Sequence, residues 1–126
     1  MAEEISVVGG FTPDVGAAAD LRTHQWKLVQ FGAGGVKLAV NDQGSGGAFA
    51  LWATANSGGF VTLAGAPNVV KAYADGAMVR GSWVKVSTNT SGWALAAGSA
   101  GSAGIVGVAL SACASGSLFS LKLGVI

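Results

Sequence analysis

Apolar residues alternate with polar or small residues along most of this chain, in short runs that are separated by Gly, Asn and Ser. Alternation of this kind is typical of half-buried β-strands, and the Gly-rich interruptions are typical of turns. The sequence GAGG at 32–35 and the sequence ANSGG at 55–59 each predict a hairpin. The pattern predicts strands over Gln25–Phe31, Val36–Val40, Ala48–Thr54, Phe60–Ala64, Val69–Ala74, Met78–Ser87, Trp93–Ala97, Ile105–Ser111 and Leu118–Leu123.

These elements indicate an all-β protein, folded as a small antiparallel β-barrel or sandwich. Only residues 16–23 (GAAADLRT) have the composition of a short helix, because three consecutive alanines favour one or two turns. The length of 126 residues allows a single domain.

An internal repeat divides the strands into two similar four-strand units. Residues 26–55 align without gaps to residues 83–112, with nine identities in thirty positions. We therefore assign residues 25–126 to one β domain, with repeats at about 26–64 and 83–123 and a linker at 65–82. Residues 1–24 lie outside both repeats.

The first residues differ in charge from the rest of the chain. Residues 1–25 carry four carboxylates and one arginine, whereas residues 26–126 carry six cations and two carboxylates. Two interpretations stay open for residues 1–24: an extended N-terminal arm that docks on a partner, or a frayed terminus. The arm interpretation predicts that deleting residues 2–18 leaves the β domain folded. Its candidate contact residues are Glu3, Glu4, Ile5, Val7, Val8, Phe11 and Arg22.

Composition excludes several classes of protein. The formal net charge is only +1, which argues against a nucleic-acid binder. A single Cys113 excludes a disulfide scaffold. No run of about 18 apolar residues predicts a membrane helix, and the acidic start MAEEISVVGG is unlike a secretory signal. We expect a soluble protein that is made in a cytoplasm and has no membrane partner.

The sequence offers little for catalysis or for metal binding. His24 and Cys113 are the only histidine and the only cysteine, and their sequence contexts match no nucleophile motif. A structural zinc site needs several such ligands. The glycine-rich segment 98–104 matches no phosphate-binding loop. We expect no enzymatic activity, no cofactor and no bound metal.

Four tryptophans are the largest side chains. Trp26 and Trp83 occupy equivalent positions in the repeat, which predicts that both lie in the core. Trp52 and Trp93 have no equivalents, and each could lie in the core, in a subunit interface or on a sugar-binding surface.

Several segments together resemble the small Gly/Ala-rich head decoration, or capsid cement, proteins of tailed bacteriophages. The resemblance covers about 105 of the 126 residues. It runs through HQWKLVQFGAGGVKLA (24–39), a central stretch at 48–97, and AGIVGVALSACASGSLFSLKLG (103–124). Ala19-Asp20-Leu21 before Trp26 matches the usual opening of the family, and the segment Gly107–Ala112 matches its ending. Gly81-Ser82-Trp83-Val84 departs from the family, which has an acidic residue in that turn.

The resemblance implies a structural virion protein on the outside of the capsid. Such a protein would bind the assembled shell of major capsid protein and stabilise it. It also implies a homo-oligomer, with a trimer expected first and a dimer second. An alternative from another class is a carbohydrate- or host-surface-binding module on a virion, such as a head fibre or tail component.

Overall fold

The structure is a computed structural model, and it describes residues 10–40, 49–65, 68–98 and 105–124. These residues form nine β-strands and no helix, which confirms the all-β prediction. No helix in this part of the chain could therefore cross a membrane. The strands are β1 (Leu28–Gly32), β2 (Gly35–Leu38), β3 (Phe49–Ala53), β4 (Thr62–Ala64), β5 (Val69–Tyr73), β6 (Trp83–Val86), β7 (Ala94–Ala97), β8 (Ile105–Ala109) and β9 (Leu118–Leu123).

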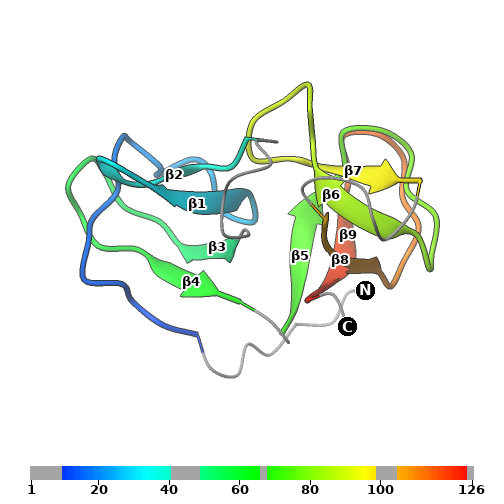
Figure 1. The fold of residues 1–126 in the computed structure, drawn as a ribbon, viewed down its shortest axis with the longest axis horizontal. Helices are drawn as coiled ribbons and strands as arrows, with labels where there is room; N and C mark the ends of the chain where they lie inside the picture. Colours follow the sequence, from blue (N-terminus) through cyan, green and yellow to red (C-terminus); the bar gives the residue numbers. More distant parts are fainter. Residues whose placement is uncertain (1–9, 41–48, 66–67, 99–104, 125–126) are drawn as a thin grey trace.

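The strands form two antiparallel sheets that lie side by side in Figure 1. The first sheet has the order β2-β1-β3-β4, and the second has the order β5-β9-β8-β6-β7. The arrangement is sandwich-like and is not closed into a barrel, so of the two predicted architectures the structure has the sandwich. The segment predicted as a linker contributes β5, and the second sheet therefore has five strands instead of four.

The connectivity of the first sheet recurs in the second. In the first sheet, the second strand in chain order pairs with the first, the first with the third, and the third with the fourth. The last four strands of the chain pair in the same succession, β7-β6-β8-β9, with β5 added beside β9. Each of these four-strand sets, β1–β4 and β6–β9, thus begins with a hairpin. Two further antiparallel strands then follow on the other side of the first strand of the hairpin.

Two hydrophobic clusters fill the molecule. The larger cluster lies mainly inside the second sheet and includes Leu28, Ala39, Ala50 and Ala64 from the first sheet. The smaller cluster covers the other face of the first sheet. Its members are Ala17, Leu21, Val29, Val36, Leu51, Val61 and Leu63. The first sheet is therefore buried on both faces, and part of its cover comes from residues that precede β1.

Residues 11–24 belong to the β domain, which differs from the predicted arm. Phe11 forms an antiparallel bridge with Leu63 of β4, and Ala17 forms a parallel bridge with Val36 of β2. Within the described residues, seven backbone hydrogen bonds join residues 11–21 to the first sheet and to the turn after β3. Residues 16–23 form a bridge, bends and turns, so the helix suggested by the alanines is absent. Backbone pairing with two sheet edges outweighs the weak helix propensity of this segment.

The two edges of the second sheet approach each other at one isolated bridge. Ala74, just after β5, forms a parallel bridge with Ala94 at the start of β7. The Asp75 amide donates a hydrogen bond to the Ala94 carbonyl oxygen at 2.7 Å. Residues 78–82, predicted as part of a long strand, instead form a turn, and Met78 pairs with Cys113.

A buried glycine joins the two halves of the molecule, of which the first half holds the first sheet and the second half holds the second sheet. The Leu28 amide donates to the Gly92 carbonyl oxygen at 2.7 Å, and the Gly92 amide donates to the Ala39 carbonyl oxygen at 2.8 Å. Gly92 has a positive φ of 81°. A Cβ there would lie 3.0 Å from Leu38 Cδ2 and 3.2 Å from Lys27 Cβ. The turn before β7 can therefore reach the first sheet only because this residue lacks a side chain.

Candidate interaction surfaces

The predicted contact residues are only partly within the described chain. Glu3, Glu4, Ile5, Val7 and Val8 lie outside the described residues. Phe11 is paired with β4 and is 38% exposed. Arg22 is exposed and forms an ion pair with Asp20, with 2.8 Å between Nη2 and Oδ2. Phe11 and Arg22 thus lie on the body of the first half, as part of the segment that covers the first sheet.

Asp20 and Arg22 form a bidentate pair at the surface. Arg22 Nε donates to Asp20 Oδ1 at 2.9 Å, and the Arg22 amide donates to the same oxygen at 3.0 Å. These hydrogen bonds from Arg22 lower the pKa of Asp20 from 3.8 to about 2. Because both side chains are solvent-exposed, this pair fixes the local turn more than it stabilises the fold.

Three phenylalanines line one end of the smaller cluster. Phe49 of β3 contacts Phe11 and Phe31 edge-to-face, with ring centroids 5.5 Å apart in both pairs. Phe31 on β1 is 45% exposed. Phe49 itself packs against the core. This apolar edge was not singled out by the sequence analysis, because the three residues belong to three different segments.

The four tryptophans are all half-buried, so the prediction that Trp26 and Trp83 lie in the core is wrong. Trp26 and Trp52 meet at right angles, with ring centroids 5.0 Å apart and an interplanar angle of 89°. Trp93 stacks on Tyr73 of β5 at 5.4 Å. For Trp83, strand alternation explains the error, since this residue stands on the face of β6 opposite to the buried Val84 and Val86. Trp26 lies in the turn before β1, outside any strand.

Two lysines connect these aromatic pairs at the junction of the two halves. Lys71 Nζ of β5 lies 5.9 Å from the ring of Trp26, and Lys27 Nζ lies 5.9 Å from the ring of Trp93. In one pair, Lys27 belongs to the first half and Trp93 to the second. In the other pair, Trp26 belongs to the first half and Lys71 to the second. Cation–π contacts of about 0.5–1 kcal/mol each at such sites would stabilise the relative position of the sheets.

Trp26 also has an unusual backbone. Its φ of 70° is the only positive value of a non-glycine residue in the described part of the chain. A bulky residue in this left-handed region costs about 1–3 kcal/mol, which the surroundings must offset. The Trp26 amide donates to the Leu51 carbonyl oxygen at 2.9 Å, and Gln25 Nε2 donates to the Trp52 carbonyl oxygen at 3.0 Å. The strained turn therefore holds Trp26 against Trp52 at the junction.

His24 and Cys113, the candidates for an enzymatic pair, have different partners. His24 Nδ1 lies 3.0 Å from Lys27 Nζ. Burial, and then the nearby charge of Lys27, lower the pKa of His24, so the neutral ring accepts this hydrogen bond at pH 7. The Cys113 thiol faces the Ser117 carbonyl oxygen at 3.7 Å, and burial raises its pKa. The structure does not bring the two side chains together.

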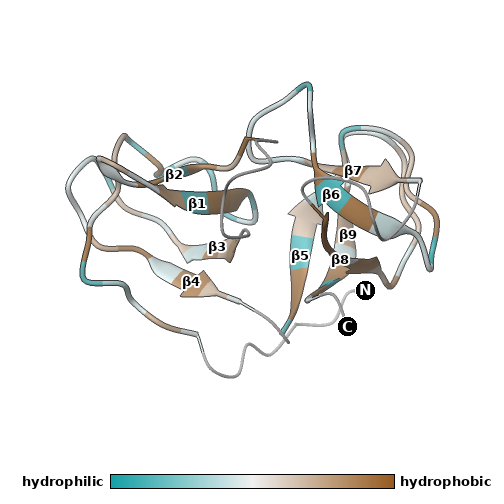
Figure 2. Cartoon of the chain, viewed as in Figure 1, coloured by the Kyte–Doolittle hydropathy of each residue, from teal (hydrophilic) through white to brown (hydrophobic). Residues whose placement is uncertain are grey.

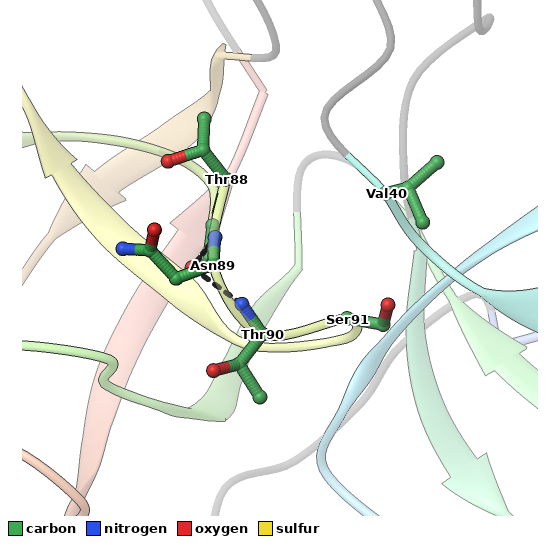
Figure 3. Close-up of a pocket in the computed structure, with 6 residues that line it drawn as sticks. Val40, Thr88, Asn89, Thr90 and Ser91 are labelled. Atoms are coloured by element: carbon green, nitrogen blue, oxygen red, sulfur yellow. Dashed lines mark hydrogen bonds between the residues drawn. The ribbon is translucent and has the colours of Figure 1, made fainter.

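A polar hollow of about 190 Å³ lies between Val40 and residues 87–91. Figure 3 shows the turn that forms one wall, with the Asn89 and Thr90 amides donating to Ser87 Oγ at 3.0 and 3.1 Å. The Ser87 hydroxyl in turn donates to the Asp75 carboxylate. The described lining holds hydroxyl and amide groups and no titratable side chain. In the described residues, no group of three His, Cys, Asp or Glu side chains could hold a metal.

Comparisons with known proteins give a fold and no family. No protein-family model matches the chain, and no curated protein matches it. Among solved structures, the chain is similar to the head fiber gp8.5 N base of bacteriophage phi29, with a TM-score of 0.63 and 14% sequence identity. The match covers 91% of this chain and 92% of that chain. The chain is therefore similar in fold, over 91% of its length, to the base of a phage head fibre.

Proposed function

We propose that this chain is a structural protein of a phage virion, attached to the outside of the head. The observation that carries the proposal is the fold match to a phage head fibre base, which extends over nearly all of both chains. The resemblance of the sequence to phage head decoration proteins supports the same assignment from independent features, namely the motifs of strands and turns. We expect no catalysis and no cofactor as part of this function.

Within this role, we favour cementing of the shell of major capsid protein. A cement protein needs a stable body and surfaces for protein contacts, and it needs no reactive group. The half-buried aromatic residues and exposed phenylalanines of this chain suit protein contacts. A homotrimer is the oligomer that we expect, followed by a dimer, because cyclic association covers apolar surface without forming an open chain.

The second candidate is a base for a fibre or a module that binds the host surface. The solved structure to which the fold is similar is a head fiber base, which favours this alternative. The two candidates differ in what attachment does to the particle. A cement protein strengthens the shell, whereas a fibre base only needs to attach to it.

Attachment and stabilisation can be measured separately. Purified chain is mixed with expanded, DNA-free shells of a phage that carries it, and the bound fraction is measured by co-sedimentation. The temperature at which DNA-filled particles release DNA is then measured with and without the chain. Binding together with a higher release temperature supports cementing, and binding without such a rise supports the fibre base. Absence of binding at micromolar concentrations would overturn the proposal.

The oligomeric state and the expected absence of a role for reactive side chains are tested by separate measurements. Sedimentation equilibrium of the free protein should give a mass near three times 12.3 kDa. The variants His24→Ala and Cys113→Ala should attach to shells as the original chain does. A monomer that persists at high concentration would contradict the trimer, and loss of attachment in either variant would contradict a role without reactive groups.

A further inference from the structure

The outward face of the second sheet carries a continuous row of side chains across all five strands. Direct cross-strand pairs join Val69 to Lys122, Lys122 to Val108, Val108 to Trp83, and Trp83 to Ala97. Neighbours in such a row lie about 5 Å apart on the same face of a sheet. All five residues of the row are half-buried, so none belongs to the buried core.

This face is apolar for a sheet face that points away from the core. The inward residues of the same strands, such as Phe119, Leu121 and Val84, are buried in the larger cluster. The outward residues beside the row include Leu110 and Leu118, which are 42% and 37% exposed. Leu110 is placed next to β9 by its amide, which donates to the Ser120 carbonyl oxygen at 2.8 Å. Outward faces of antiparallel sheets in water are normally polar, and this one is not.

The charges on this face are all positive in the described part of the chain. Lys85 and Lys122 stand on the outward sides of β6 and β9, and neither side chain has an ion pair or hydrogen bond there. The described carboxylates lie elsewhere. Asp75 accepts a hydrogen bond from Ser87, while Asp14 and Asp20 belong to the segment that covers the first sheet. Figure 2 shows hydrophobic colour along β8 and mixed colours on β5 and β6.

We propose that this outward face, centred on β9, β8 and β6, docks on a protein surface of the capsid shell that is apolar and carries carboxylates. The inference rests on the proposed function and names the face and the chemistry of its partner. The uncompensated lysines favour acidic groups, and the row of Val and Trp favours a packed, dry centre. A nucleic acid or an anionic polysaccharide fits less well, because the described part of this face carries three lysines, one of which, Lys71 of β5, already lies against the Trp26 ring, and this gives little phosphate neutralisation.

The test compares two charge reversals of the same size. Lys122→Glu changes the row, whereas Lys37→Glu changes a lysine on β2 of the first sheet that has no ion pair with any described residue. We expect Lys122→Glu to weaken co-sedimentation with shells at least tenfold and Lys37→Glu to change it less than twofold. Leu110→Ser, at an exposed apolar position, should weaken binding by several-fold without altering the net charge. Circular dichroism of each variant verifies that it is folded, and Lys85→Glu replaces Lys122→Glu if the latter does not fold.

The outcomes separate this inference from the proposed function. If the original chain binds shells and Lys122→Glu, Lys85→Glu and Leu110→Ser bind equally well, the assignment of this face is overturned and the function stands. If the original chain does not bind, the proposed function itself fails. Binding to heparin or to DNA that Lys122→Glu abolishes, with shell binding unchanged, would overturn the protein partner in favour of an anionic polymer. Self-association that only the face variants lose, with shell binding unchanged, would overturn it in favour of a second copy.

Discussion

The two sheets share the connectivity of four strands, yet their edges are covered in different ways. In the second sheet, Ala74, just after the edge strand β5, forms a single bridge with Ala94 of the other edge strand, β7. The first sheet is closed by a separate segment, since Phe11 pairs with the β4 edge and Ala17 with the β2 edge. An unpaired sheet edge is a site for aggregation, and both devices cover it. Two sheets with the same strand connectivity can therefore have their edge strands covered by different parts of the chain.

The difference between the two sheets is tested most directly by removing most of residues 11–24, the covering segment of the first sheet. Deleting residues 2–18 removes six of the seven backbone hydrogen bonds to the first half and exposes Val36 and Leu63. At about 1 kcal/mol of net stability per hydrogen bond, we expect a loss of about 6 kcal/mol. Calorimetry should show a much lower melting temperature, and the Val36 and Leu63 amides should lose protection from hydrogen exchange. Unchanged melting would mean that the segment is a dispensable arm after all.

One glycine in each half can be replaced by alanine to test the backbone contacts that hold that half together. A Cβ on Gly35 would lie 2.2 Å from the Gly16 carbonyl oxygen, and one on Gly107 would lie 1.9 Å from the Lys122 carbonyl oxygen. Both clashes are with backbone, so Gly35→Ala and Gly107→Ala should each cost about 3 kcal/mol or more in urea unfolding. Gly35→Ala should release the covering segment, whereas Gly107→Ala should separate β8 from β9. Gly116→Ala, with a φ of 85° and open space, is the control and should cost about 1–2 kcal/mol.

The junction between the halves can be loosened at Gly92. Gly92→Ala keeps both sheets but places a Cβ against Leu38 and Lys27 at a positive φ. We expect a loss of about 2 kcal/mol in thermal unfolding and a redshift of tryptophan emission, because Trp93 and Trp26 gain contact with water. If the emission spectrum and stability stay unchanged, the hydrogen bonds through Gly92 do not hold the halves together.

The smallest effect concerns pH. The pKa of Asp20 is lowered to about 2 in the folded chain from 3.8, so its contribution to stability is present above about pH 4 and is lost as the pH falls towards 2. Asp20→Asn should remove this acid dependence and leave stability at pH 7 nearly unchanged, because the pair is exposed. NMR titration of the Asp20 carboxyl carbon gives the pKa directly. A value near 3.8 would show that Arg22 does not hold the carboxylate in solution.

The sequence predicted the strands well because their signals are local. Alternation over Val69–Tyr73 or Trp83–Val86, followed by Gly or Asn, is enough to place a strand. The strand predicted over Val69–Ala74, between the two repeats, is β5, but the repeat gave no indication that it would join the second sheet beside β9. Which residues complete a sheet edge depends on contacts between distant segments, and nothing in FTPDVGAAAD marks Phe11 and Ala17 as edge partners.

The surfaces were harder to predict than the strands. The equivalence of Trp26 and Trp83 in the repeat suggested burial, but alternation decides which face a residue occupies, and it directs Trp83 outward. The left-handed backbone of Trp26 has no sequence signal, because such a conformation is normally glycine's. The Phe11, Phe31 and Phe49 edge requires three segments to meet, which only the fold reveals.

The covering segment also sets the order of events during synthesis. Phe11 and Ala17 leave the ribosome before their partners Leu63 and Val36, which lie in β4 and β2. Contacts between residues so far apart in the chain form late, because loop closure must precede them. A nascent chain therefore carries Phe11 and Ala17 unpaired until the first sheet exists. This segment is therefore made before its partners and pairs with them only after both edge strands of the first sheet exist.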